Sequence, residues 1–325
     1  MKKISNRGKI VIVSVLIVLA GITVAAALIT NSVRAPEPEA DKTEEARGSG
    51  DVVEDSEIIT DGLSRREGVF TILVVGEDAA SRSTDTIMLA LFDTVEKKMN
   101  IMSIPRDTIV NVKRKIKKIN GSYSANKGNI YALYDEVESV TGVRPDKYVL
   151  VTVDGFVQLI DAIGGVEIDV PIDMVYSDRS QNLTINIKKG LQTLNGYDAM
   201  GFMRYRKTYV DGDLGRIKAQ HKFVDAVIKK MIKPSTFMRV PEIARIISEN
   251  VDTDLTLGNE IWLGKQMLSM NLETDVKIDT LPGYADYYNR LSYYFPNRDE
   301  VLELVNERYN PYTESITKLN LFKKQ

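Results

Sequence analysis

The chain has no cysteine and a single histidine, His221, among its 325 residues. The absence of cysteine excludes disulfide bonds, thiolate metal ligands and cysteine nucleophiles. A single histidine excludes a multi-histidine metal centre and would leave a serine hydrolase dependent on His221 alone. Carboxylates, arginines and lysines must then carry any chemistry, and this combination suits phosphate groups held with a hard cation such as Mg²⁺.

The chain also lacks an excess of charge of either sign, since its formal net charge is −2. There is no overall positive field of the kind that attracts nucleic acids, so any anion must be bound by local clusters. Hydrophobic residues make up 43% of the chain and charged residues 27%, a balance that indicates an ordinary folded protein.

A long apolar run stands near the N-terminus, at residues 10–30. About 20 such residues cross a bilayer core as one helix. Basic residues within positions 1–9 precede the run, so the positive-inside rule keeps this end in the cytoplasm and places the rest outside the cell. We therefore expect a single-pass protein of the cell membrane with an uncleaved signal-anchor. A cleavable signal peptide is the alternative, and the small residues Ala25–Ala27 keep it open.

Residues 31–66 are rich in Glu, Asp, Pro, Gly and Ser and poor in large apolar side chains. Such a segment cannot bury enough surface to fold, which predicts a disordered acidic linker. Residues 67–325 then form the extracytoplasmic folded part.

Strand and helix patterns interleave through this folded part without an internal repeat, which predicts a single α/β domain with a central mixed sheet covered by helices on both faces. We expect Asp154 to be the N-cap of the helix at 154–163. A polar turn at 93–98 predicts a hairpin of the second and third strands. The expected strands are 69–75, 86–92, 99–104, 146–153, 166–170 and 276–281, and the expected helices are 129–140, 154–163, 194–203, 213–232, 241–248, 257–270 and 298–309.

Two aspartates flank the loop between the first two strands. Asp78 follows the first strand and Asp85 precedes the second, so both carboxylates are expected at the same edge of the sheet. With the hydroxyls of Ser83 and Thr84 they form a plausible oxygen site for Mg²⁺. Aspartates at strand ends are also common turn and cap residues, and that alternative stays open.

Basic residues follow the third strand. Pro105 ends this strand and fixes the backbone, so Arg106 projects from a defined place. Lys118 follows the basic stretch at 113–117. A purely structural ion pair of Arg106 with Asp107 is the alternative interpretation.

A further cluster lies near residue 210. If residues 204–206 are extended, Arg204 and Arg206 share one face of the strand. Asp213, Arg216 and Gln220 have the spacing that places them on one face of a helix. Guanidinium groups bind phosphate in a bidentate manner, so this set suits a pyrophosphate. The alternative is a solvent-exposed helix face with Asp213 as its N-cap.

Eight motifs between about residues 70 and 235 resemble, in order, those of the LytR-CpsA-Psr family of bacterial cell-wall proteins. They are Ile72–Asp78, Ser83–Thr86, Ser103–Asp107, Lys118–Asn120, Asp161–Val166, Leu194–Gly196, Arg204–Arg206 and Asp213–Arg216. The N-terminal anchor fits the family as well, whereas no family motif is found beyond residue 235.

The resemblance implies an α-β-α sandwich that acts as a transferase in cell-wall biogenesis. Such an enzyme moves a glycopolymer, for example wall teichoic acid or capsule, from a polyprenyl pyrophosphate carrier to a peptidoglycan hydroxyl. The family's metal-binding residues would be Asp78 and Asp85, which hold Mg²⁺. Its pyrophosphate-binding residues would be Arg106, Lys118, Arg204, Arg206, Arg216 and Gln220. Arg106, Arg204, Arg206 and Asp213 are expected to be catalytic, and either Asp85 or Asp213 is the general base.

The sequence departs from the family pattern at two places, and the first departure is expected to reshape the mouth of the site. The loop between Asp78 and Asp85 is shorter than usual, and the Gly-Gly pair expected after the Lys118 motif is replaced by Asn126–Asn129. The alternatives to a transferase are a regulator that binds the lipid pyrophosphate and a lipid pyrophosphatase. No nucleic-acid partner is expected, because the folded part lies outside the cell.

Overall fold

The computed structural model divides into two compact units, one formed by Pro36–Val149 with Met270–Gln325 and the other by Met1–Ala35 with Leu150–Ser269. The residues that the structure describes are 35–36, 60, 62–78, 83–178, 183–205, 219, 222–223, 226–227, 230, 236, 239–256, 258–260, 262–263, 266, 270 and 274–324. The predicted anchor at 10–30 lies outside them, as does the predicted linker at 31–66 apart from residues 35–36, 60 and 62–66. Among the described residues, no helix has the length and apolar character needed to cross a bilayer.

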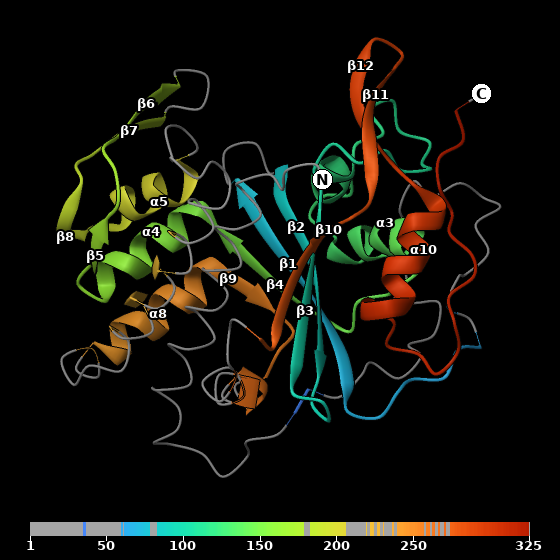
Figure 1. Cartoon of the computed structure of the whole chain (residues 1–325), viewed down its shortest axis with the longest axis horizontal. Helices are drawn as coiled ribbons and strands as arrows, with labels where there is room; N and C mark the ends of the chain where they lie inside the picture. The colour runs from blue at the N-terminus through green and yellow to red at the C-terminus, as the bar shows by residue number, and fades with distance from the viewer. Residues whose placement is uncertain are drawn as a thin grey trace. The chain divides into compact units, whose positions relative to one another are not determined.

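A six-stranded mixed sheet organises the fold, with the strand order β10-β3-β2-β1-β4-β9 (Figure 1). Its strands are β1 (Val69–Asp78), β2 (Ser83–Asp93), β3 (Lys98–Ile104), β4 (Lys147–Thr152), β9 (Val251–Thr253) and β10 (Val276–Thr280). β2 is antiparallel to both β1 and β3, whereas β10 is parallel to β3. The predicted mixed sheet and the predicted β2–β3 hairpin are thus confirmed.

The middle strands are buried on both faces, and this explains their continuous apolar sequences. All seven residues from Val69 to Val75 are at most 5% exposed. A strand covered on both sides has no polar face, so it cannot show the alternation of a half-buried strand.

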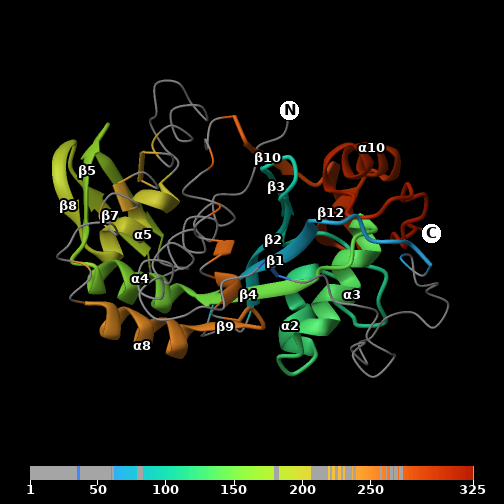
Figure 2. The same cartoon turned by 90° about the horizontal axis from the view of Figure 1, so that it is seen from below.

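The unit that contains 36–149 and 270–325 places its longer helices on the same side of the sheet (Figures 1 and 2). α3 (Ile130–Thr141) begins where the Asn129 side chain accepts a hydrogen bond from the Tyr131 amide, and ends at Gly142 with a φ of 74°. The predicted helix at 129–140 is therefore confirmed. The remaining elements are η2 (Ile119–Gly121), α2 (Ser122–Ala125), β11 (Gly283–Tyr288), β12 (Leu291–Pro296), α10 (Arg298–Leu304) and the π-helical turn η4 (Val305–Tyr309).

The unit that contains 150–269 has two small antiparallel sheets, β5 with β8 and β6 with β7. The expected strand at 166–170 forms β5, but it pairs with β8 and not within the central sheet. The described elements are α4 (Val153–Ala162), β5 (Val166–Val170), β6 (Met174–Asp178), β7 (Leu183–Ile187), β8 (Gly190–Leu194), α5 (Gly196–Arg204) and α8 (Val240–Asn250). Within the predicted helices at 213–232 and 257–270, the described positions 219, 222–223, 226–227, 230, 258–260, 262–263 and 266 are helical.

The predicted N-cap of α4 is wrong. The helix starts at Val153, and the Thr152 hydroxyl accepts the capping hydrogen bond from the Gly155 amide at 3.0 Å. Asp154 therefore lies inside the first turn, where a carboxylate still favours the positive end of the helix dipole. A threonine at the end of a strand can cap as well as an aspartate, which is why the sequence placed the cap two residues too late.

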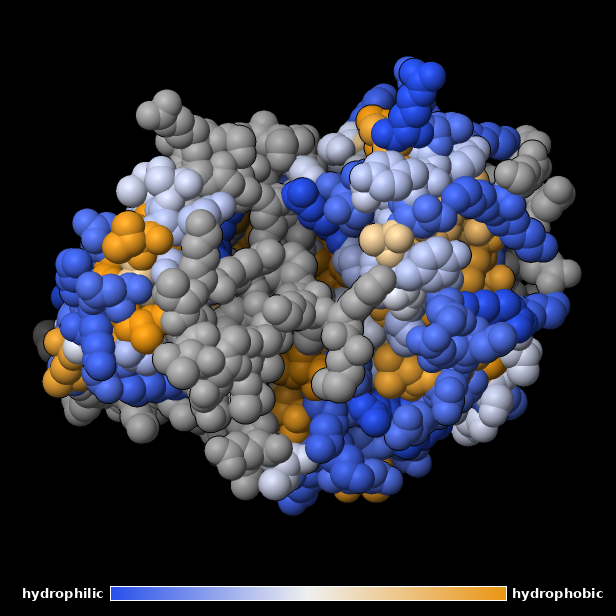
Figure 3. All heavy atoms as spheres, turned by 45° about the horizontal axis from the view of Figure 1, so that its top comes forward, coloured by the Kyte–Doolittle hydropathy of each residue, from blue (hydrophilic) through white to orange (hydrophobic). Residues whose placement is uncertain are grey.

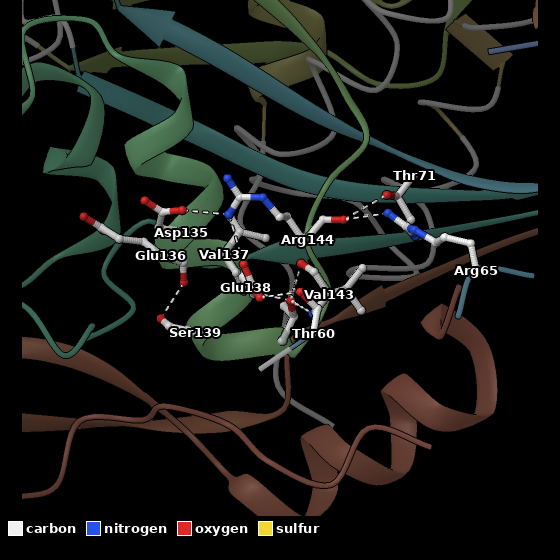
Figure 4. A network of polar contacts seen from close by, with 11 residues as sticks. Thr60, Arg65, Thr71, Asp135, Glu136, Val137, Glu138, Ser139, Val143 and Arg144 are labelled. Carbon is white, nitrogen blue, oxygen red and sulfur yellow. Dashed lines mark hydrogen bonds and ion pairs between the residues drawn. The ribbon is translucent and has the colours of Figure 1, made fainter. Parts of the chain in front are cut away.

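A buried carboxylate joins β1 to the start of β4. Asp146 is fully buried, and its Oδ2 accepts hydrogen bonds from the Thr71 amide at 2.7 Å and the Thr71 hydroxyl at 2.8 Å. The Arg65 guanidinium pairs with the other oxygen. It also donates to the Arg144 carbonyl, a hydrogen bond that Figure 4 shows. The polar cluster thus holds the chain before β1 against the start of β4.

The same network continues onto α3. Arg144 pairs with Asp135 at 2.7 Å and Glu138 at 3.0 Å, and the Thr60 hydroxyl donates to Glu138 at 2.8 Å (Figure 4). Helix α3, the segment that leads into β4 and the segment before β1 therefore share one network of ion pairs and hydrogen bonds.

We expect Asp146→Ala to lower the free energy of unfolding by about 3–5 kcal/mol, because Arg65 and Thr71 lose a partner inside the protein. Asp299 is the matched control, since it is 91% exposed and, among the described residues, pairs with Arg298 at the surface. Asp299→Ala should cost less than about 1 kcal/mol. Urea denaturation followed by circular dichroism measures both, and equal losses would contradict the assigned role of Asp146.

Candidate functional site

The nine candidate site residues are distributed over both units. Asp78, Asp85, Arg106 and Lys118 belong to the unit with 36–149, whereas Arg204, Arg206, Asp213, Arg216 and Gln220 belong to the unit with 150–269. The structure describes the side chains of Arg106, Lys118 and Arg204 and the backbone of Asp78 and Asp85. Arg206, Asp213, Arg216 and Gln220 lie outside the described residues, as does His221.

The backbone brings Asp78 and Asp85 to one edge of the sheet. Asp78 is the last residue of β1 and pairs with Ser83, the first residue of β2. The register shifts between Gly76, which faces Thr86, and Glu77, which faces Thr84, so Asp85 is the extra residue of a β-bulge. Bulges bend a strand and redirect its side chains, and they are frequent next to functional sites.

The loop after β3 places Arg106 and Lys118 at that edge as well. β3 is antiparallel to β2, with Ile104 facing Ile87, so β3 ends where β2 begins. The amides of Ile119 and Asn120 donate to the carbonyls of Thr108 and Arg106 at 2.9 and 3.2 Å. The Lys118 motif therefore lies directly against the Arg106 motif, although eleven residues separate Arg106 from Lys118 in the chain.

Asp107 pairs with Lys118 more closely than with Arg106. The Lys118 Nζ is 2.8 Å from Asp107 Oδ1, whereas the Arg106 Nε is 3.9 Å from Oδ2. The Arg106 side chain remains 42% exposed. The alternative of a structural Arg106–Asp107 pair thus has little geometric support, and an exposed pair of this kind contributes little stability.

Asn120 links the Lys118–Asn120 motif to the Ser83–Thr86 motif. Its residue type alone did not mark it as a candidate. Its Nδ2 donates to Ser83 Oγ at 3.0 Å, and its carbonyl accepts from the Thr84 hydroxyl at 3.2 Å. The start of β2, which leads to Asp85, is therefore bonded to the segment that carries Lys118. Membership of the Lys118–Asn120 motif was the only signal in the sequence that could have indicated this role.

A buried ion pair fixes the backbone at Lys118. Arg114 and Glu136, which are 10% and 4% exposed, form a bidentate pair, and Arg114 Nη2 also donates to the Lys118 carbonyl at 2.8 Å. The Lys118 ammonium lies 5.6 Å from the centre of the Tyr293 ring. In the neighbouring residue, burial lowers the pKa of Lys117, and the Arg114 guanidinium adds to this effect.

The replaced glycine pair keeps the backbone shape that glycines would give. Lys127 and Gly128 both have a positive φ, 56° and 86°. A lysine in the left-handed region is strained, but a single such residue is tolerated in a turn. Two successive residues with positive φ thus lie within the segment that replaces the glycine pair.

The last residue of α5 is Arg204. Asn195 caps this helix by accepting a hydrogen bond from the Asp198 amide at 2.8 Å, and Asp161 Oδ1 accepts from the Gly196 amide at 2.7 Å. The backbone becomes extended only at Tyr205, which is buried. The condition that residues 204–206 are extended, on which Arg204 and Arg206 would share one face, therefore does not hold at Arg204, which still belongs to the helix.

In the unit with 36–149, Arg106 and Lys118 lie at the same sheet edge as the hydroxyls of Ser83 and Thr84. In the unit with 150–269, Arg204 lies at the C-terminus of α5. Arg106 and Lys118 are suited to bind phosphate oxygens, for which guanidinium and ammonium groups are the usual partners. No group of three or more potential metal ligands occurs among the described residues, a set that does not include the side chains of Asp78 and Asp85.

We expect Gly196→Ala to lower the free energy of unfolding by about 1–3 kcal/mol, because a methyl group there collides with the Val157 backbone and pushes α5 away from α4. Gly201 is the control on the same helix, since a methyl group there meets Ile185 at an ordinary 3.4 Å. Gly201→Ala should change stability by less than about 1 kcal/mol. Equal urea midpoints for the two variants would refute the close α4–α5 contact.

Comparison with known proteins identifies the family of the chain. The LytR_cpsA_psr family model matches residues 30–310. The chain is 34% identical to the polyisoprenyl-teichoic acid–peptidoglycan teichoic acid transferase TagV of Bacillus subtilis (strain 168), over 76% of this chain and 67% of TagV. It is 32% identical to the regulatory protein MsrR of Staphylococcus aureus (strain COL), over 68% of this chain and 67% of MsrR. The crystal structure of B. subtilis TagV superposes with a TM-score of 0.54 at 28% identity and covers 74% of this chain and 97% of that one. The chain belongs to the LytR-CpsA-Psr family.

Proposed function

We propose that the chain transfers a wall glycopolymer, such as teichoic acid or capsule, from a polyprenyl pyrophosphate carrier to a peptidoglycan hydroxyl. The observation that carries the proposal is the pairing of the Arg106 and Lys118 segments at the sheet edge that also holds Asp78 and Asp85. A pyrophosphate needs several cations at one place, and this edge offers two. Membership of the family and the transferase name of TagV support the same reaction.

In the proposed reaction, a peptidoglycan hydroxyl attacks the phosphorus that carries the glycan. A new phosphodiester forms, the bond to the bridging oxygen breaks, and polyprenyl phosphate leaves with the electron pair. Arg106 and Lys118 bind the pyrophosphate oxygens and stabilise the charge that moves to the leaving group. Arg204, Arg206, Arg216 and Gln220 are proposed to bind the same pyrophosphate, and Asp85 or Asp213 to accept the proton of the hydroxyl.

The donor set at the sheet edge fits a hard cation. Asp78 and Asp85 would hold Mg²⁺, since carboxylates are its preferred protein ligands and the hydroxyls of Ser83 and Thr84 belong to the same strand. When bound, the ion would neutralise part of the pyrophosphate charge. The protein itself mainly orients and shields the substrate, which suits a chain without cysteine.

We further propose that residues 10–30 anchor the protein in the cell membrane with its folded part outside the cell. The length of the apolar run and the basic residues before it support this topology. An anchored enzyme would meet the carrier lipid in its own membrane.

A regulator that binds the lipid without turnover is the second candidate, favoured by the similarity to the regulatory protein MsrR. A lipid pyrophosphatase is the third, in which water replaces the peptidoglycan hydroxyl. The products separate the three: polymer linked to peptidoglycan for a transferase, free phosphorylated polymer for a pyrophosphatase, and unchanged lipid for a regulator.

We expect Arg106→Ala and Arg204→Ala each to lower the transfer rate by about 100-fold or more, because a cation that stabilises the transition state is removed. The assay incubates the full chain with Mg²⁺, a lipid-linked wall polymer and peptidoglycan oligomers, and detects the phosphodiester product by mass spectrometry. Arg245→Ala is the control, since Arg245 is exposed and pairs with Glu249 within α8. The absence of product from the unmodified chain with every polymer tested would rule out the transferase.

Removal of divalent cations should abolish transfer, and added Mg²⁺ should restore it, because Asp78 and Asp85 are expected to hold the ion. Asp78→Asn should raise the Mg²⁺ concentration needed for half-maximal rate by about tenfold or more, the loss typical of a disrupted metal site. Asp299→Asn, at an exposed position, should leave it unchanged. Full activity in the presence of a chelator would contradict the metal assignment and leave the transfer reaction intact.

A further inference from the structure

Among the described residues of the unit that contains 36–149 and 270–325, the exposed large aliphatic side chains are Val95, Ile116 and Leu291, and the last two stand directly next to basic residues. Ile116, which is 55% exposed, lies within the basic stretch Lys113–Lys117, and Leu291, which is 42% exposed, begins β12. Tyr284 of β11 is 50% exposed and lies on the same face of the hairpin as Leu291, because side chains alternate along a strand and the cross-strand pairs are Tyr284 with Phe295 and Tyr288 with Leu291. Exposed apolar side chains on one face commonly mark a contact surface.

The turn that presents Leu291 is tight. Tyr288 faces Leu291 across the hairpin, and the two residues between them, Asn289 and Arg290, have φ values of 48° and 64°. Two successive residues with positive φ form the turn that best fits the twist of a two-stranded hairpin. Leu291 and Arg290 therefore stand at a defined end of the hairpin, which projects from the unit in Figure 1.

The basic stretch and the hairpin lie side by side. The Lys117 amide donates to the Tyr293 hydroxyl at 3.4 Å, and the Lys117 ammonium lies 5.8 Å from the centre of the Phe322 ring. Phe322 packs against Tyr288 with ring centres 4.8 Å apart. Three segments, 111–118, 283–296 and 320–324, thus form one surface, which we call the basic-aromatic face.

Charge is segregated on the basic-aromatic face. Of the eight lysines and arginines in its three segments, Arg114 pairs with Glu136 inside the protein and Lys118 pairs with Asp107. The exposed basic residues are Lys113, Lys115, Arg290, Lys323 and Lys324, against one acidic residue, Asp286, although the chain as a whole has a net charge of −2. Asp286 itself pairs with Lys324 at 2.7 Å. Figure 3 shows hydrophobic side chains next to strongly hydrophilic ones where the hairpin projects. The occupant of this face must therefore be anionic.

We propose that the basic-aromatic face docks the folded unit on an anionic lipid bilayer. Ile116 and Leu291 would enter the headgroup region, Tyr284 would lie at the interface, and Lys113, Lys115 and Lys323 would contact lipid phosphates. An anionic polymer in water would satisfy the lysines, but it offers no apolar phase for Ile116 and Leu291. The exposed aliphatic side chains therefore favour a lipid bilayer over a soluble anionic polymer as the binding partner.

This contact goes beyond the proposed transfer reaction and does not depend on it. The proposed anchor at 10–30 is separated from the start of β1 by the 38 residues at 31–68. A second contact made by the folded unit itself would hold one face of the unit toward the lipid.

The test uses the absence of cysteine from the chain. Ile116→Cys, Leu291→Cys and Val95→Cys each introduce a single attachment site for a dye whose emission shifts to the blue in an apolar environment. Val95 is the matched control, because it is 74% exposed and lies in the same unit. It occupies the turn that precedes β3, whereas the loop with Ile116 follows the opposite end of β3. The full chain is reconstituted in vesicles of phosphatidylcholine with and without phosphatidylglycerol.

We expect a blue shift for the labels at 116 and 291 in vesicles that contain phosphatidylglycerol, and no shift for the label at 95. Lys113→Gln combined with Lys115→Gln should reduce the shift at 291. Equal emission from all three labels, or no response to phosphatidylglycerol, would overturn the proposal. A shift caused by soluble polyglycerol phosphate in detergent, without a shift in vesicles, would overturn it in favour of a polymer. Urea midpoints within error of the unmodified chain verify that the labelled variants fold.

Discussion

The hydrogen bonds between Asp146 and Thr71 are the constraint on which the order of the central sheet depends. A carboxylate that is fully buried can persist only when each oxygen has a partner, and here Thr71 and Arg65 provide them. These bonds hold the start of β4 against β1, and Arg65 brings the preceding chain to the same place. With β1 and β4 fixed side by side, the antiparallel pairing of β1 with β2 and of β2 with β3 determines which strand ends meet at one edge.

That edge carries the first half of the candidate site, and its shape comes from backbone irregularities. The bulge at Asp85 interrupts the β1–β2 ladder, and the loop after β3 folds back so that the Lys118 segment bonds to the Arg106 segment. The buried Arg114–Glu136 pair then holds the carbonyl of Lys118 from α3. A cation at the surface is thus positioned by an ion pair inside the protein. This arrangement gives Lys118 a defined location, while Arg106 remains accessible to a phosphate.

Most of the fold could be predicted because its strongest signals are local. The buried strands are continuous apolar runs, and α3 shows its N-cap and its terminal glycine in the sequence. β6, β7 and β8 were missed because short, two-stranded ribbons with exposed residues such as Val175 and Leu191 carry little hydrophobic pattern. The β11–β12 hairpin was missed for a related reason: its tyrosines alternate between buried and exposed positions, as Tyr293 and Tyr287 do, and a tyrosine suits both.

The sequence by itself determined the family, the candidate phosphate-binding residues and the mixed α/β character, because each rests on residue type and order. It also placed Asp78 and Asp85 at one sheet edge, which follows from consecutive antiparallel strands. Only the tertiary structure decided that Asp107 pairs with Lys118, that Asn120 joins this segment to Ser83, and that Arg204 ends a helix. The physical reason is that these contacts depend on how the loop after β3 folds back and on where α5 ends. The hydrophobic periodicity of the sequence predicts neither.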